Sequence, residues 1–200
     1  DEYPRLNLIA RWDVGAERTV HLNSHYDVVP VSQGWSRDPF DPTVQGQWLY
    51  GRGADDMKDS IAATLMAIEA LQETGGAPAF NLECSFTADE EIGGDLGAGY
   101  IAKHGHIRAD YIVNCEGGTG RDIGCGHNGV LWLEITVHGK AAHASRPDSG
   151  LNAFEKMAEL TLRLRALKDR FASPTRVFTT PSGATRGPTM SMGGVCHGTE

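Results

Sequence analysis

The feature that most limits the fold of this chain is a series of short apolar segments interrupted by one long helical pattern. The short segments have the length and composition of buried β-strands; they are residues 6–10, 19–24, 80–87 and 111–115. Between the second and third of them, apolar residues recur at helical spacing over residues 57–74 and stop at Gly75 and Gly76. A shorter helix is expected at residues 96–104. This alternation predicts an α/β domain, residues 1–124, with a central, mostly parallel sheet flanked by helices.

A different pattern follows the first domain. Residues 131–137 alternate between apolar and polar side chains, as in a strand with one solvent-facing side. Residues 157–171 carry apolar side chains at steps of three and four, which is typical of an amphipathic helix. Two short extended pieces are expected at residues 176–179 and 189–193. We therefore predict a second, smaller α+β domain at residues 125–200, still incomplete where the chain stops.

Charge and composition exclude several classes of partner. The net charge is −8, and neither Lys nor Arg is clustered, so we expect no nucleic acid and no anionic membrane surface as a partner. No apolar run approaches the roughly 20 residues that span a bilayer, and the N-terminus lacks the layout of a signal peptide. Four cysteines are spread widely without a C-x-x-C pair. These features favour a reducing, cytoplasmic location.

Acidic residues and one histidine stand where the predicted strands end or the helix begins. Each motif alone has an ordinary interpretation as a surface ion pair, a helix cap or a solvated loop residue. In an open α/β sheet, however, ligands bind at the edge formed by these strand ends, and converging carboxylates repel one another unless cations neutralise them. A set of Asp, Glu and His favours zinc or a similar divalent ion in a two-metal hydrolytic site. The candidates are His25, Asp27, Asp55, Asp56, Glu90, Glu91 and Glu116.

Five motifs in order along the chain resemble the M20 family of metallopeptidases and deacylases. They are HxDVVP, W-x-x-x-P-F, GRG-x-x-DMK, DEE-x-GG and GKAAHASRPDSGLNA. The resemblance implies a zinc-hydrolase α/β catalytic domain with two Zn²⁺ ions per complete subunit, for which Co²⁺ or Mn²⁺ could substitute. It also implies an inserted ferredoxin-like α+β dimerisation or lid domain, here incomplete, and hence a homodimer formed through residues 125–200.

The same resemblance assigns the metal ligands. It makes His25 a ligand of one ion, with Asp27 as its catalytic neighbour. Asp56, directly before the Met-Lys pair of its motif, corresponds to the aspartate that bridges both ions. Glu116 completes the site of His25, and Glu91 binds the second ion.

Two further residues receive catalytic roles from the resemblance. Glu90 corresponds to the general base that takes a proton from a metal-activated water and passes it to the leaving amine, whereas Asp89 is expected only to support the loop. His143 corresponds to a histidine that reaches the partner subunit's active site and stabilises the oxyanion.

The chain also departs from the family pattern. A complete member has a second metal-binding histidine near its C-terminus, and nothing here corresponds to it. The chain therefore resembles about half of a subunit, and we expect it to bind at most one metal ion tightly and to hydrolyse little by itself.

Three functional interpretations stay open. The first is a deacylase that cleaves the amide bond of an N-acyl amino acid, of the deacetylase or desuccinylase type. The second is a dipeptidase or carboxypeptidase of the same family, acting on a short peptide. The third is a catalytically incomplete fragment that serves only in binding or dimerisation. A phosphate-binding protein that uses the GRGADD segment is disfavoured, because its acidic residues would repel phosphate.

Overall fold

The computed structural model describes residues 4–117, 121, 123–124, 126–172 and 177–194. The chain divides into two compact units, residues 1–124 and residues 125–200. None of the helices in the described ranges is long and apolar enough to cross a membrane.

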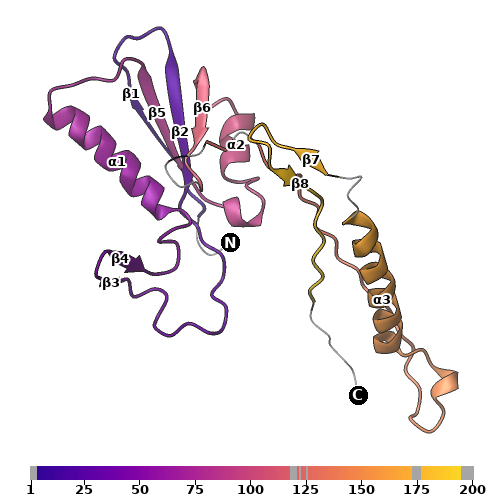
Figure 1. Cartoon of the computed structure of the whole chain (residues 1–200). Coiled ribbons are helices and arrows are strands. Elements are labelled where there is room, and N and C mark those ends of the chain that lie inside the picture. The colour runs from indigo at the N-terminus through magenta and orange to yellow at the C-terminus, as the bar shows by residue number, and fades with distance from the viewer. Residues whose placement is uncertain (1–3, 118–120, 122, 125, 173–176, 195–200) are drawn as a thin grey trace. The chain divides into compact units, whose positions relative to one another are not determined.

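The first unit is built on a four-stranded mixed sheet with the order β1-β5-β2-β6 (Figure 1). The strands are β1 (Leu8–Trp12), β2 (Thr19–His25), β5 (Asn81–Thr87) and β6 (Tyr111–Asn114). β2 runs parallel to both of its neighbours, β5 and β6. β1 is an antiparallel edge strand beside β5. The expected strands are all present, with ends shifted by one or two residues.

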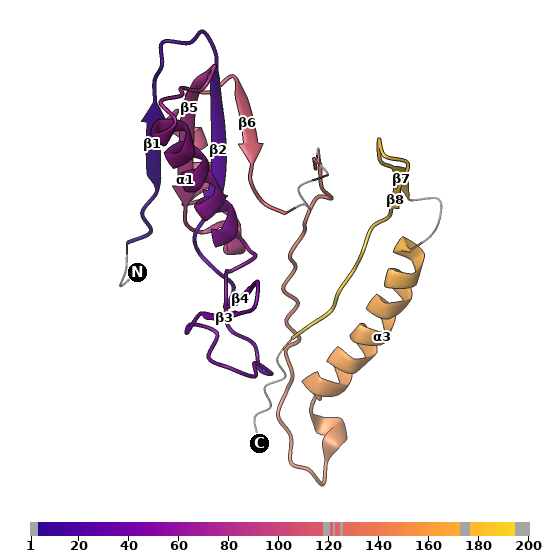
Figure 2. The ribbon, with the colours of Figure 1, turned by 60° about the vertical axis from the view of Figure 1, so that its left-hand side comes forward.

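Two helices flank this sheet. α1 (Lys58–Glu73) is followed by Gly75, whose φ of 67° is a conformation that glycine adopts easily. α2 (Ala98–Lys103) is a shorter helix between β5 and β6. The two helices lie on opposite sides of the strands, and Figure 2 shows α1 along one face. Both were predicted, within two residues at each end. The loop before α1 contains a small hairpin of β3 (Thr43–Gln45) and β4 (Trp48–Tyr50).

The interior of the first unit is unusually polar. Its buried apolar side chains are Met57, Leu82, Cys84, Ala88 and Ile101. Among the described residues of this unit, the buried polar and charged side chains are more numerous; they are His21, Ser24, His25, Thr64, Glu83, Ser85, Thr87 and Asp89. Because buried polar groups destabilise a fold unless they are hydrogen-bonded, most of this interior must be organised as hydrogen-bond networks.

The second unit is dominated by α3 (Ala153–Phe171). The helix begins four residues before the predicted start, because the side chain of Asn152 caps it by accepting hydrogen bonds from the backbone N–H groups of Phe154 and Glu155 at 3.0 and 3.3 Å. A short helical turn, η2 (Pro147–Ser149), precedes it. A two-stranded hairpin of β7 (Phe178–Thr179) and β8 (Thr185–Arg186) follows it.

The prediction of a strand at residues 131–137 is wrong. In the described part of the chain no neighbouring segment pairs with these residues, so their backbone has no ladder hydrogen bonds. Side chains of both predicted faces are exposed, including 79% of Leu131 and 91% of Trp132. Alternation indicates which face of a strand is buried, but it does not supply a partner. The extended piece at residues 189–193 is not a strand either. The ferredoxin-like arrangement of this unit therefore stays a prediction.

Candidate metal centre

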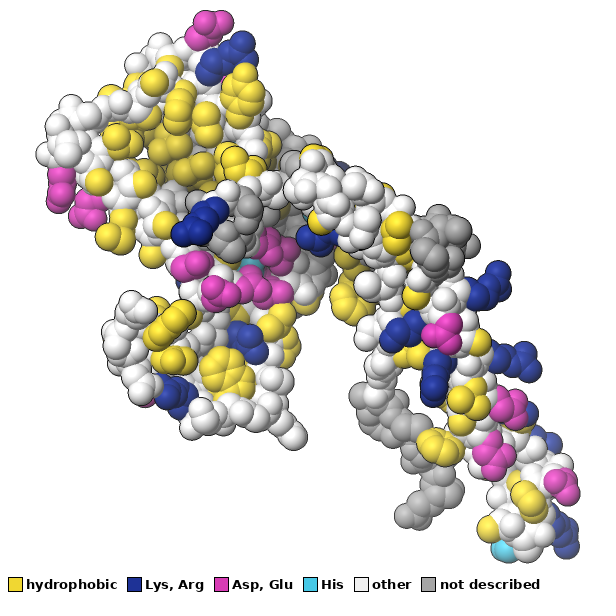
Figure 3. All heavy atoms as spheres, viewed as in Figure 1, with side chains coloured by type: hydrophobic (Ala, Val, Ile, Leu, Met, Phe, Trp, Pro, Cys, Tyr) yellow, Lys and Arg dark blue, Asp and Glu magenta, His cyan; other side chains and the backbone are white. Residues whose placement is uncertain are grey.

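The parallel strands bring the acidic motifs to one edge of the sheet. β2 ends at His25, β5 ends shortly before Glu90, and Glu116 follows the end of β6 by two residues. Asp56 stands two residues before the start of α1. Because neighbouring parallel strands have their carboxyl ends on the same side, these segments converge. Figure 3 shows the acidic side chains gathered around a histidine at this edge.

His25 is the buried centre of the group, with only 1% of its surface exposed. Its Nδ1 lies 3.1 Å from the backbone carbonyl oxygen of Asp27 and 3.4 Å from the Asp27 carboxylate. An N–H on Nδ1 that donates to this carbonyl leaves the lone pair of Nε2 available for a cation. The backbone N–H of His25 donates to the sulfur of Met57 at 3.2 Å. Met57 therefore holds the backbone of His25, and Asp27 holds its ring.

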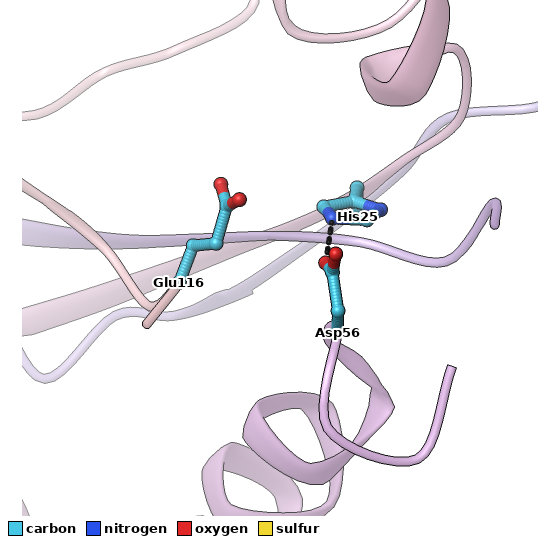
Figure 4. Close-up of side chains that lie close together, drawn as sticks. All are labelled: His25, Asp56 and Glu116. Atoms are coloured by element: carbon cyan, nitrogen blue, oxygen red, sulfur yellow. Dashed lines mark hydrogen bonds and ion pairs between the residues drawn. The ribbon is translucent and has the colours of Figure 1, made fainter. Parts of the chain in front are cut away.

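Three donor groups meet at this point. One ligand atom each from His25, Asp56 and Glu116 lie within 4.8 Å of one another. Nε2 of His25 is 3.0 Å from Oδ1 of Asp56. Figure 4 shows Asp56 reaching the ring from the start of α1 and Glu116 lying beside them after β6. One imidazole and two carboxylates form a donor set that suits Zn²⁺ or a similar divalent ion.

Asp27 connects the histidine to the loop that carries Glu90. Its two carboxylate oxygens accept hydrogen bonds from the backbone N–H groups of Glu90 and Glu91, at 3.3 and 3.2 Å. These residues begin the short helical turn η1 (Glu90–Ile92). Asp27 therefore contacts both the ring of His25 and the backbone of the η1 turn. The sequence did not predict that Asp27 would connect them.

Glu90 lies within reach of the same centre. Its Oε2 is 3.9 Å from Nε2 of His25. Burial raises the pKa of the Glu90 carboxyl above its usual range; the negative charge of Glu116 adds to this, and His25 opposes it. A carboxylate with a raised pKa accepts and returns protons more readily near neutral pH, as a general base must.

Asp89, the first residue of the acidic run, has a structural position. Its side chain is buried, accepts a hydrogen bond from the backbone N–H of Leu96 at 2.9 Å and forms an ion pair with Arg5. Its φ of 73° lies in the left-handed region, which Asp tolerates better than most residues. Asp89 therefore supports the loop, as expected.

Two further predicted site residues, Glu91 and His143, have hydrogen-bond partners of their own. Oε1 of Glu91 accepts a hydrogen bond from the backbone N–H of Val29 at 3.1 Å. His143 belongs to the unit of residues 125–200, where its Nδ1 lies 2.8 Å from the Ser145 hydroxyl. The assignment of Glu91 to a second metal ion and of His143 to the oxyanion stays a prediction.

The sequence predicted no special role for Met57 or His21, yet both are fully buried. Met57 contacts the backbone of His25, and His21 lies four residues before His25 on β2. The position of Met57 directly after Asp56 was a usable signal, because apolar side chains around a metal site limit the access of solvent to it. His21 carried no such signal, since its partners lie on another strand.

Comparisons with known proteins find several similar sequences. The sequence profile of peptidase family M20/M25/M40 matches residues 21–198. An uncharacterized metallohydrolase of Methanocaldococcus jannaschii is 32% identical over 157 residues, which are 74% of this chain and 38% of that protein. A succinyl-diaminopimelate desuccinylase of Cereibacter sphaeroides is 35% identical over 171 residues, 79% of this chain and 44% of that protein. The chain thus spans less than half the length of these relatives.

Among solved structures, an M20 family metallo-carboxypeptidase of Sulfolobus solfataricus superimposes with a TM-score of 0.51 at 32% identity. The match covers 56% of this chain and 26% of that structure.

Proposed function

The chain belongs to peptidase family M20/M25/M40, and from this premise we propose that it forms the metal-binding part of a hydrolase that cleaves the amide bond of an N-acyl amino acid. The observation that carries the proposal is the meeting of His25, Asp56 and Glu116 beside Glu90 at one sheet edge. The likeness to a desuccinylase over 79% of the chain favours an acyl amino acid as the substrate class.

Each residue of the site has its own role in the proposed reaction. His25, Asp56 and Glu116 would hold a divalent ion, which when bound would supply Lewis acidity to lower the pKa of a water towards about 7 and to polarise an amide carbonyl. Glu90 takes the proton of the attacking water and returns it to the leaving amine. Asp27 keeps Glu90 in place, because its carboxylate holds the backbone at the start of η1.

Other parts of the proposal extend to the whole protein. Glu91 would bind a second Zn²⁺ ion, together with a ligand from outside the described residues. His143 would stabilise the oxyanion in a partner subunit, in a homodimer formed through residues 125–200. The exposed apolar side chains of this unit, such as Leu131 and Trp132, support an assembly role for it.

A second candidate function is that of a carboxypeptidase acting on a short peptide. The superposition on the Sulfolobus metallo-carboxypeptidase at 32% identity favours it. Both reactions use the same metal-assisted attack on an amide. They differ in the substrate: the deacylase removes an acyl group from the nitrogen of an amino acid, whereas the carboxypeptidase removes an amino acid from the end of a peptide.

Hydrolysis assays test the proposal. With Zn²⁺ or Co²⁺ added, we expect slow release of the amino acid from N-succinyl and N-acetyl amino acids, and slower cleavage of dipeptides. Glu90→Gln should bind the metal ion normally and lose turnover by about 10²- to 10⁴-fold. Glu69→Gln, an exposed change on α1, is the matched control. A Glu90→Gln variant with wild-type turnover would disprove the role of Glu90, and faster dipeptide cleavage would favour the carboxypeptidase.

A further inference from the structure

A row of polar side chains crosses the interior of the sheet beneath the metal centre. In the register of β2 and β5, His21 stands opposite Glu83 and Asn23 stands opposite Ser85, so all four side chains share one face. His21 and Ser85 are 0% exposed and Glu83 is 1% exposed. Nδ1 of His21 lies 2.7 Å from Oε1 of Glu83, and Nε2 lies 2.8 Å from the hydroxyl oxygen of Ser85. Both ring nitrogens therefore have partners.

The row continues across β2 to β6 and reaches the metal centre. The Ser85 hydroxyl lies 2.8 Å from Oδ1 of Asn23, and the side-chain amide of Asn23 donates to Oδ1 of Asn114 at 2.9 Å. The side-chain amide of Asn114 then donates to Oε2 of Glu116 at 3.3 Å. An unbroken chain of hydrogen bonds thus links the buried side chains of Glu83 and His21 to Glu116, a candidate metal ligand.

The chemistry of each group fixes the direction of every bond in this chain. A carboxylate only accepts, so Asn114 must turn its NH₂ toward Glu116 and its oxygen toward Asn23. Asn23 then gives its NH₂ to Asn114 and its oxygen to Ser85. Ser85 has one proton and uses it on Asn23, so its oxygen must accept from Nε2–H of His21. The reverse order would point the oxygen of Asn114 at the carboxylate of Glu116, which is repulsive.

The other end of the chain supplies the balancing charge. Burial alone would raise the pKa of Glu83, but hydrogen bonds from the Arg108 backbone N–H, His21 and Arg11 outweigh it, so the pKa lies below its usual value. The backbone nitrogen of Arg108 lies 2.9 Å from the carboxylate, and Nε of Arg11 lies 2.5 Å from it. Glu83 is therefore ionised and accepts from Nδ1–H of His21. In the bond direction set by Glu116, Nε2 donates as well, so this chain of hydrogen bonds calls for a proton on each ring nitrogen of His21.

We propose that Asn114 and Asn23 are positioning residues for Glu116, and that a buried Glu83–His21 ion pair, with His21 as an imidazolium, sets the direction of the chain that holds them. With Oε2 of Glu116 held by Asn114, its other oxygen is left for the cation. Outer groups of this kind typically change metal affinity by about 10- to 100-fold. The inference rests on the proposed metal centre, since Glu116 matters here as a ligand.

Nuclear magnetic resonance of the metal-free chain tests the direction of the bonds without any metal. The spectra are recorded at about pH 7.5, where a free imidazole, with its ordinary pKa of about 6.5, is mostly neutral. Long-range ¹H–¹⁵N spectra should show one ring with both nitrogens protonated, and its signals should be missing in His21→Gln. Ser85→Ala, which removes the acceptor of Nε2–H, should return that ring to a neutral form. A neutral His21 ring in the wild-type chain would overturn the proposed polarity.

Metal titration tests the positioning role. Asn114→Ala, a change at an exposed residue, should weaken Co²⁺ or Zn²⁺ binding by about 10-fold or more and alter the Co²⁺ absorption spectrum. Asn128→Ala, an exposed asparagine of the other unit, should leave both unchanged. Asn114→Ala with wild-type affinity would overturn the positioning role. If the wild-type chain binds no metal ion, the proposed function fails, and the His21 measurement still decides whether the buried chain exists.

Discussion

Replacement of Glu83 by Gln is the change that most severely tests the buried polar interior of the first unit. Glu83 is 1% exposed and its carboxylate receives three donors, from His21, the Arg108 backbone and Arg11. Gln has nearly the same shape, so the variant creates no cavity. It replaces one acceptor oxygen by an NH₂ group, which cannot accept a hydrogen bond from the donors around it. It also removes the negative charge.

The expected loss of stability follows from these contacts. Oε1 of Glu83 accepts from both Nδ1–H of His21 and the N–H of Arg108, and Oε2 accepts from Arg11. An NH₂ group at either position therefore leaves at least one donor without its acceptor, which costs about 1–3 kcal/mol. The buried His21 ring also loses its counter-charge, and removal of one partner from a buried ion pair typically costs about 3–5 kcal/mol. These two estimates describe overlapping effects, so we expect a loss of about 4 kcal/mol. Because domains are stable by only about 5–15 kcal/mol, much of the chain would unfold at moderate temperature.

Urea denaturation followed by circular dichroism measures this loss. Arg18→Gln is a suitable control in the same unit, because its ion pair with Asp110 at 3.8 Å is exposed and should be worth less than about 1 kcal/mol. A free energy of unfolding for Glu83→Gln within about 1 kcal/mol of wild type would refute the assignment of Glu83 as an ionised, buried partner of His21.

Three further outcomes are expected. The pKa of Glu83 is lower in the folded state than its ordinary value of about 4.3. Ionised Glu83 therefore stabilises the fold fully above about pH 4.3, and this stabilisation is lost as the pH falls through the lower, folded-state pKa. Thermal melts at decreasing pH should show the loss in wild type and not in Glu83→Gln. Gly97→Ala should destabilise the loop before α2 by about 1–3 kcal/mol or more in the same denaturation assay, because a Cβ there would lie 1.8 Å from the backbone oxygen of Ala88; an unchanged midpoint would contradict the packing. Burial raises the pKa of the Cys84 thiol to about 11, and Cys115 and Glu83 add to the effect, so Cys84 should react with a thiol reagent only after unfolding; mass spectrometry that finds it modified in the folded chain would contradict this.

The sequence was sufficient to predict the scaffold of the first unit. Its strands and helices have strong periodic signals, and parallel strands necessarily bring their ends together. The sequence could therefore predict that His25, Asp56 and Glu116 converge, and one ligand atom from each lies within 4.8 Å of the others. The contacts of Asp27 with the η1 turn could not be predicted. Glu90 and Glu91 lie 63 and 64 residues after Asp27, and the local sequence does not specify how the two loops approach each other.

The buried chain under the site was hidden for a related reason. His21 and Glu83 look like ordinary strand residues until the register between β2 and β5 places them opposite each other, 62 positions apart in sequence. The same limit explains the failed strand at residues 131–137. Its pattern suits one buried face, but pairing depends on a partner that the local sequence does not specify.

The most direct test of the central claim is a Zn²⁺ titration that compares two adjacent aspartates by isothermal calorimetry. Asp56 contributes to the donor group, whereas Asp55 is predicted to be only its neighbour. We expect wild type and Asp55→Ala to bind one Zn²⁺ ion with similar affinity. Asp56→Ala should bind at least about 100-fold more weakly, since outer groups alone account for 10- to 100-fold. Equal affinities for Asp56→Ala and wild type, or no Zn²⁺ binding by wild type, would contradict a metal centre at His25, Asp56 and Glu116.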